Sequence, residues 1–153
     1  MGRHAGFLGA SAALAGAANY VILPELFTDP ESVLNDIQQQ VAIHRQRYGH
    51  ESYIIVLTEN LWPSGINALA EALETRTDGE VRPVILGHVQ RGGSPVSQDR
   101  ILATTLGVQA VRSIEQGKNG IMVATAQGDV VEVALEETWQ HKKTLGNMLT
   151  HCM

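Results

Sequence analysis

The residues with the clearest chemical potential lie between positions 82 and 95 of this chain of 153 residues. Arg82 opens an apolar run, and His88 and Arg91 follow where that run ends, just before Gly92-Gly93. Guanidinium and imidazole groups donate hydrogen bonds that suit the oxygens of a phosphate. Glycines let backbone N–H groups approach a ligand, and the start of a following helix favours an anion. The pattern therefore predicts a site for a phosphate ester.

A plainer interpretation of the same segment stays open. Gly92-Gly93 can be an ordinary turn, and the arginines can be solvated or paired with acids. The segment has no Gly-Lys-Ser/Thr sequence, so it does not indicate a Walker A nucleotide loop. Ser94 has no base within its motif and is not expected to be a nucleophile. No metal site is expected either, because metal-ligand spacing is absent among His4, His44, His50, His141 and His151.

The elements that must hold these residues alternate between strand-like and helix-like patterns. Apolar or β-branched runs predict strands over residues 20–23, 53–57, 81–86, 121–124 and 130–134. Apolar residues at helical spacing predict helices over residues 5–18, 30–48, 66–73, 97–116 and 136–153. Ligands of open α/β sheets bind beyond the carboxyl ends of the strands, where His88 and Arg91 would then lie. The predicted fold class is α/β, with mainly parallel sheets and helices on both faces.

Local signals mark the ends of several of these elements. Asp29 can cap the N-terminus of a helix whose first residue is Pro30, and Gly49 can end it in a left-handed conformation. Ser97 is the expected N-cap of the helix that follows the glycine-rich loop. Gln127-Gly128-Asp129 predicts a hairpin turn between the last two strands.

The overall composition is that of an ordinary soluble globular protein, with 44% hydrophobic and 18% charged residues. No apolar run reaches the roughly 18 residues that a membrane-spanning helix needs. The formal net charge of -5 argues against broad nucleic-acid binding, which usually requires a basic face. Cys152 is the single cysteine and cannot form an internal disulfide, which favours a reducing, cytoplasmic compartment.

Three segments of the chain resemble one known family. The run from Gly87 to Pro95, Gly-His-Val-Gln-Arg-Gly-Gly-Ser-Pro, followed by Asp99-Arg100, resembles the signature of phosphofructokinases. The opening Met1–Gly6 resembles a second family motif, and Val56–Glu59 resembles a third, in the same order and at fitting separations. The resemblance suggests the C-terminal half of a bacterial-type ATP-dependent 6-phosphofructokinase, without the half that holds the nucleotide and the catalytic base.

This resemblance implies a role for each matching residue. The residues expected to contact the sugar of fructose 6-phosphate are Met1, Gly2, Arg3 and Glu59, the last by accepting hydrogen bonds from its hydroxyls. The residues expected to meet the sugar phosphate are His88, Val89, Gln90 and Arg91. Arg82 would reach across a subunit interface to the neighbour's 6-phosphate, which implies a homo-oligomer. No catalytic residue is expected in this chain. Glu59 has a plainer alternative role, which is to cap a turn.

The resemblance also predicts how the chain is divided and what the complete enzyme would need. Residues 1–88 would be mostly the smaller, fructose 6-phosphate-binding lobe, and residues 89–153 the remainder of the larger lobe plus a returning C-terminal helix. Mg²⁺ and ATP are expected for the complete enzyme, with neither bound by this half alone. The chain alone is therefore predicted to have no kinase activity.

Two alternatives and one departure from the family stay open. The phosphoryl donor could be pyrophosphate instead of ATP, and the chain could be a non-catalytic sugar-phosphate-binding module. Many bacterial members carry a glutamate at the position of Asn19 and basic residues at that of His50-Glu51. The usual effector site is therefore expected to be altered or absent.

Overall fold

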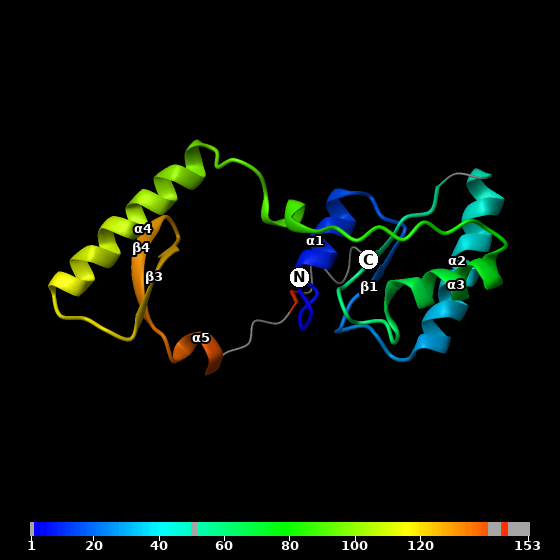
Figure 1. Ribbon diagram of the computed structural model, residues 1–153, viewed down its shortest axis with the longest axis horizontal. Helices are drawn as coiled ribbons and strands as arrows, with labels where there is room; N and C mark the ends of the chain where they lie inside the picture. The colour runs from blue at the N-terminus through cyan, green and yellow to red at the C-terminus, as the bar shows by residue number, and fades with distance from the viewer. Residues whose placement is uncertain (1, 50–51, 141–144, 147–153) are drawn as a thin grey trace. The chain divides into compact units, whose positions relative to one another are not determined.

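The computed structural model describes residues 2–49, 52–140 and 145–146. The chain divides into two compact units, unit 1 (residues 1–85 and 144–153) and unit 2 (residues 86–143), each treated by itself below. Unit 1 contains α1 (Phe7–Ala15), β1 (Tyr20–Ile22), α2 (Pro30–Tyr48), β2 (Ile55–Leu57) and α3 (Gly65–Thr77), as Figure 1 shows. Unit 2 contains η1 (His88–Arg91), α4 (Ser97–Glu115), β3 (Ile121–Ala126), β4 (Asp129–Ala134) and α5 (Glu137–Gln140). The assignment of residues 1–88 and 89–153 to two lobes of a larger enzyme stays a prediction.

The strands of unit 1 form a parallel pair that is covered on both faces. Ile22 lies opposite Leu57 in the β1–β2 ladder. Ile22 packs with buried residues of α2 and α3, whereas its neighbour Leu23 packs with Ala10 of α1. Successive residues of a strand point to opposite faces, so this alternation places α1 on one face and α2 and α3 on the other. The predicted α/β class with helices on both faces is confirmed.

The helix α2 begins and ends where its local signals place it. The Asp29 carboxylate accepts hydrogen bonds from the backbone N–H of Ser32 at 2.9 Å and from its hydroxyl at 2.7 Å. These bonds lower the pKa of Asp29, the side-chain bond from Ser32 more than the backbone bond. Gly49 follows the helix with a φ of 77°, a conformation that favours glycine. The buried residues of the helix face the core of unit 1; they are Val33, Leu34, Ile37 and Val41.

Unit 2 is an antiparallel hairpin with one long helix packed against it. The loop between β3 and β4 consists of Gln127 and Gly128, both with positive φ, which is the geometry of a tight hairpin turn. The Asp99 carboxylate accepts the backbone N–H of Val96 at 2.9 Å, and so supports the start of α4. Ser97 is the first residue of α4 and Val96 is its N-cap, so the prediction that Ser97 is the cap is wrong.

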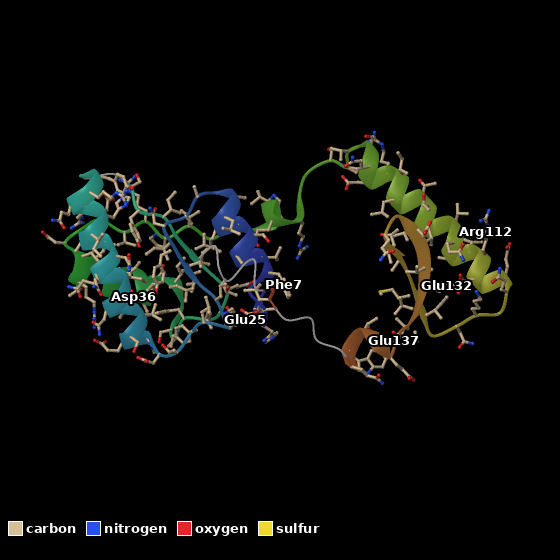
Figure 2. All side chains as sticks on the ribbon, turned by 180° about the vertical axis from the view of Figure 1, so that it is seen from behind. Phe7, Glu25, Asp36, Arg112, Glu132 and Glu137 are labelled. Carbon is tan, nitrogen blue, oxygen red and sulfur yellow. The ribbon has the colours of Figure 1, made fainter. Side chains whose placement is uncertain are left out.

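A carboxylate joins α4 to the hairpin of unit 2. Glu132 on β4 accepts hydrogen bonds from Gln109 at 2.9 Å, from the Ser113 hydroxyl at 2.7 Å and from Lys118 at 2.6 Å. Figure 2 labels Glu132 on the strand that faces α4. The bonds from Lys118, Ser113 and Gln109, in that order of effect, lower the pKa of Glu132 to about 2.

We expect this network to make the stability of unit 2 depend on pH in acid. The folded-state pKa of Glu132 lies below the ordinary value of 4.5, so its contribution is fully present above that pH and is lost as the pH falls towards about 2. The urea midpoint of the wild type should therefore exceed that of Glu132→Gln at neutral pH, and the difference should shrink through this window. Glu136→Gln, an exposed carboxylate beside α5, is the matched control. A constant difference at all pH values would contradict the assignment.

Two predicted elements differ from the structure. Residues 81–86 do not form a strand, because no described segment pairs with them; Val84 and Ile85 are 71% and 79% exposed. The backbone N–H of Val81 is bound instead by the Glu74 carboxylate at 2.9 Å. The predicted helix over 136–153 is described only as α5, and Leu145 and Gly146 are not helical. The rest of that prediction lies outside the described residues.

Candidate functional site

The carboxyl ends of β1 and β2 form one edge of unit 1. Because the strands are parallel, the residues that follow them meet at this edge. Glu25 comes shortly after β1, and Thr58 and Glu59 come directly after β2. The backbone N–H of Thr58 still donates to the carbonyl of Ile22 at 3.1 Å, so the two strand ends stay in register there. This edge is where ligands of open α/β sheets are bound.

Arg3 and Glu59 come together at this edge from segments that are 56 residues apart in the sequence. The Arg3 Nη2 atom lies 3.1 Å from the Glu59 Oε1 atom, and the two side chains are 55% and 42% exposed. An ion pair this exposed contributes little stability, because water solvates both charges well. The hydrogen bond between Arg3 and Glu59 can therefore be exchanged for hydrogen bonds to a ligand at a small cost in free energy. The structure thus brings together two residues for which the family resemblance implies contact with one sugar.

Thr58 is a buried polar residue beside this pair. The residue is 4% exposed, and its hydroxyl has no hydrogen-bond partner among the described residues. A Cβ atom added to Gly9 of α1 would lie 3.1 Å from that hydroxyl and 2.8 Å from a methyl group of Leu23. The absence of a side chain at Gly9 therefore lets α1 lie close against the ends of both strands.

Glu25 is a residue of this edge that the sequence reasoning missed. Its carboxylate accepts the backbone N–H of Gly6, at 2.8 Å through Oε1 and at 3.1 Å through Oε2. The available signal was positional: Glu25, like Glu59, is the first carboxylate after a buried strand. Figure 2 shows Glu25 near the start of α1, where Phe7 is labelled.

Arg82 lies in the irregular segment that follows α3 in unit 1. Its guanidinium pairs with Glu80, at 2.9 Å from Nε and 3.1 Å from Nη2, and the side chains are 80% and 70% exposed. The hydrogen bond and charge of Arg82 lower the pKa of Glu80, and Glu80 raises the pKa of Arg82 in return. Arg82 is therefore a surface cation with a weak and exchangeable partner.

The signature segment forms η1, a single turn of 3₁₀ helix in unit 2. His88, Val89, Gln90 and Arg91 are all exposed. The Gln90 side-chain amide donates to the carbonyl of Leu86 at 2.9 Å, and Gly92 follows with a φ of 85°. Within the described part of the chain, the Arg91 guanidinium has no hydrogen-bond or ion-pair partner. This segment therefore presents an imidazole and a guanidinium to solvent.

The predicted site residues are thus divided between the two units. Gly2, Arg3, Glu59 and Arg82 belong to unit 1, and His88–Arg91 belong to unit 2. Among the described contacts only Arg3 and Glu59 touch each other. Met1 lies outside the described residues.

Asn19 has a structural role in the region where an altered effector site is expected. Its side-chain oxygen accepts the backbone N–H of Ile54 at 2.7 Å, and its own N–H donates to the Ile54 carbonyl at 2.8 Å. These bonds extend the pairing of β1 and β2 by one residue. His50-Glu51, the other half of that expectation, lies outside the described residues.

A groove of about 360 Å³ runs along β1 on the side away from β2. Its walls include Leu14 of α1 and Asp36 of α2, and the Tyr20 hydroxyl donates to the Asp36 carboxylate at 2.6 Å across one end. Burial of the phenol, followed by its hydrogen bond to Asp36, raises the pKa of Tyr20. The described residues contain no group of three or more His, Cys, Asp or Glu side chains that could hold a metal ion. They also include no helix that is long and apolar enough to cross a membrane.

The comparisons with known proteins agree with the family resemblance. The family profile described as "PFK: Phosphofructokinase" matches residues 1–114, which include all three motif segments. The chain therefore belongs to the phosphofructokinase family. It is 38% identical over 149 residues to the "ATP-dependent 6-phosphofructokinase 1" of Thermus thermophilus, covering 97% of this chain and 45% of that protein. It is 44% identical over 120 residues to the "ATP-dependent 6-phosphofructokinase" of Haemophilus ducreyi, covering 78% of this chain and 35% of that protein.

Similarity extends to an enzyme named for another donor and to solved structures. The "Pyrophosphate--fructose 6-phosphate 1-phosphotransferase" of Amycolatopsis mediterranei is 34% identical over 167 residues, which cover 95% of this chain and 47% of that protein. The structure of phosphofructokinase from Saccharomyces cerevisiae superposes with a TM-score of 0.75 at 29% identity, over 92% of this chain and 19% of that chain. The chain thus spans less than half the length of these relatives.

Proposed function

We propose that this chain is the acceptor-binding half of a 6-phosphofructokinase, which transfers a phosphoryl group from ATP to the 1-hydroxyl of fructose 6-phosphate. The observation that carries the proposal is the contact between Arg3 and Glu59 at the carboxyl edge of β1 and β2. It joins two motif segments that are 56 residues apart, both inside the region matched by the family profile. A carboxylate suits the sugar hydroxyls, and a guanidinium suits a phosphate or hydroxyl oxygen.

The remaining parts of the proposal follow the chemistry of the substrate. A sugar phosphate carries two negative charges, and the exposed His88 and Arg91 of η1 are suited to bind it, with Val89 and Gln90 beside them. Arg82, held only by a surface pair with Glu80, would supply a second guanidinium to a neighbouring subunit of a homo-oligomer. ATP, Mg²⁺ and the base that takes the hydroxyl proton would be held by residues beyond this chain. Glycolysis and the cytoplasm are the expected setting.

A chimeric enzyme tests this proposal. The half of the Thermus thermophilus enzyme that precedes the matched region is fused ahead of Met1, and ADP release is followed with ATP, Mg²⁺ and fructose 6-phosphate. We expect turnover that depends on fructose 6-phosphate and is much weaker with glucose 6-phosphate. The 153-residue chain alone should show none. A folded, inactive chimera would contradict the proposed half-site, and turnover by the chain alone would contradict its dependence on a second half.

A pyrophosphate-dependent enzyme is the second candidate, favoured by the 34% identity to the Amycolatopsis protein over 95% of this chain. The donor contacts would again lie beyond this chain. A second chimera, with the preceding half of the Amycolatopsis enzyme, separates the two candidates. Each chimera is assayed with the donor of its added half, so the comparison reports which half this chain matches better. We expect the Thermus chimera to have the higher kcat/KM, and the reverse order would favour a match to a pyrophosphate-dependent enzyme. If neither chimera binds fructose 6-phosphate, a non-catalytic module for another sugar phosphate becomes the better interpretation.

A further inference from the structure

The segment that carries Arg3 has little internal support. Residues 2–6 form an irregular turn that leads into α1. Its one described internal backbone bond runs from the Ala5 N–H to the Gly2 carbonyl and is long, at 3.4 Å. The position of Arg3 relative to the strand ends must therefore come from contacts with other segments. The described hydrogen bonds of this kind are the pair with Glu59, the bond from the Gly6 N–H to Glu25, and the bond from the Ala10 N–H to the Gly6 carbonyl at 2.8 Å, which joins the segment to α1.

The hydrogen bond between Gly6 and Glu25 brings the carboxylate close to the backbone of Gly6. Gly6 is buried, and its N–H points at both carboxylate oxygens of Glu25, at 2.8 and 3.1 Å. The first N–H groups of a helix have no partners within the helix and lie at its positive end, so a carboxylate there binds favourably. Ordinary helix caps are residues adjacent in sequence, whereas this carboxylate comes from a position 19 residues further along the chain.

Glu25 is itself attached firmly to the end of β1. Leu23, the residue after the strand, is fully buried. Its carbonyl accepts the N–H of Leu26 at 3.1 Å and that of Phe27 at 2.9 Å, which closes a turn around Glu25. The turn fixes Glu25 at the end of β1, and the carboxylate of Glu25 in turn holds the backbone of Gly6 close to that strand end.

A side chain at Gly6 would require Glu25 and Leu23 to move. A Cβ atom on Gly6 would lie 2.6 Å from the Glu25 Oε2 atom and 3.1 Å from the Cβ and Cδ1 atoms of Leu23. Contacts of 2.6 Å do not occur between such atoms without displacement of one of them. The close approach of Glu25 to the backbone at position 6 therefore depends on the glycine there.

We propose that Glu25 is a positioning residue for the acceptor site, holding the Arg3 segment against the carboxyl edge of β1 and β2. This inference rests on the proposed function. The pair between Arg3 and Glu59 is exposed and therefore weak, and sugar hydroxyls that donate to Glu59 would compete with Arg3 for the carboxylate oxygens. The Glu25–Gly6 bond would then be the described side-chain contact that keeps the Arg3 segment against the strand ends. Glu25 acts through the backbone of Gly6, so its loss should weaken substrate binding more than turnover.

The first test uses the 153-residue chain itself and needs no catalysis. Amide hydrogen exchange is measured by NMR for Glu25→Ala and Glu25→Gln, with Glu71→Ala, an exposed carboxylate of α3, as the control. We expect Gly6 N–H to exchange about tenfold faster or more in Glu25→Ala, with a smaller change in Glu25→Gln, which keeps an acceptor. Amides of α2 near Ile37 should not change. Equal acceleration throughout unit 1, or no change at Gly6, would overturn the proposal.

The second test measures the effect on the site in the Thermus chimera. Glu25→Ala should raise the KM and the Kd for fructose 6-phosphate about tenfold while kcat changes less than about threefold, and Glu25→Gln should restore most of the affinity. The Kd is measured without nucleotide. An inactive wild-type chimera would argue against the proposed function, whereas an active one with unchanged affinity in Glu25→Ala would overturn this inference alone.

A double variant separates positioning from simple loss of stability. Gly6→Ala forces its methyl group against Glu25, so it should weaken fructose 6-phosphate binding in the wild-type background. In the Glu25→Ala background the contact with the carboxylate is absent and the anchor is already lost, and only the contacts with Leu23 at 3.1 Å remain, so Gly6→Ala should add less than it does in the wild type. If the two changes in binding free energy were fully additive, Gly6 and Glu25 would act independently, and the proposal that they position Arg3 together would be contradicted.

Discussion

Trp62→Ala is expected to lower the stability of unit 1 by about 3–5 kcal/mol, the usual cost of truncating a buried aromatic residue. Trp62 is 6% exposed, and its ring meets Phe27 edge to face at 5.9 Å between centroids. It belongs to the core formed by Ile22 and the buried faces of α2 and α3. The measurement is urea unfolding followed by far-UV circular dichroism.

Trp139→Ala is the matched control for this prediction. Trp139 lies in α5 of unit 2 and is 60% exposed, so the same change in chemistry should alter the unfolding midpoint little. Both substitutions remove the same side chain, so the difference between their effects on stability reports the contribution of burial. Equal effects of the two substitutions, or a loss below about 1 kcal/mol for Trp62→Ala, would show that the core of unit 1 is packed differently.

Arg91→Ala is expected to have the largest effect on function, raising the KM for fructose 6-phosphate in the Thermus chimera about 100-fold. Truncating one member of a charge-assisted contact removes about 2–5 kcal/mol of binding, because the partner charge is left without compensation. The Arg91 guanidinium is exposed, with no ion-pair partner in the described part of unit 2, so it is available to a dianion. Arg91→Lys should recover only part of the loss, since an ammonium group cannot form the forked contact.

Arg112→Ala is the control for the loss of positive charge alone. Arg112 lies in the last turn of α4 in the same unit, away from the signature segment. It should leave the KM within about twofold of the wild type, a change of less than 0.5 kcal/mol. A similar loss in both variants would mean that net charge, rather than a local phosphate contact, governs affinity.

Local chemistry explains why most elements could be predicted from the sequence. Asp29, Pro30 and Gly49 act on their own backbone neighbourhood, and the structure confirms α2 between them. The apolar residues of β1 alternate between two covered faces, which is enough to indicate a buried strand. Residues 81–86 show the limit: Val84 and Ile85 have strand-like side chains, but a strand also needs a partner, and none is present among the described residues.

The candidate site was predictable where its side chains belong to the motifs that resemble the family. Arg3 and Glu59 were expected at one sugar because of the family resemblance, and the structure brings them within 3.1 Å of each other. Their roles toward a ligand stay predictions. Glu25 was missed because its partner is a backbone N–H, a group that every residue except proline carries, so its position after β1 was the one signal that the sequence offered.

The two units differ sharply in how much apolar surface they remove from water. Among the described residues of unit 2 only Ser113 is buried, while several large apolar side chains of α4 stay exposed, including Ile101, Val111 and Ile114. The heat capacity increment of unfolding scales with the apolar area that unfolding exposes. In a calorimetric scan of this chain, unit 1 would thus contribute the larger increment per residue. Any protein layer that covered α4 would raise the increment per residue and steepen the transition of unit 2.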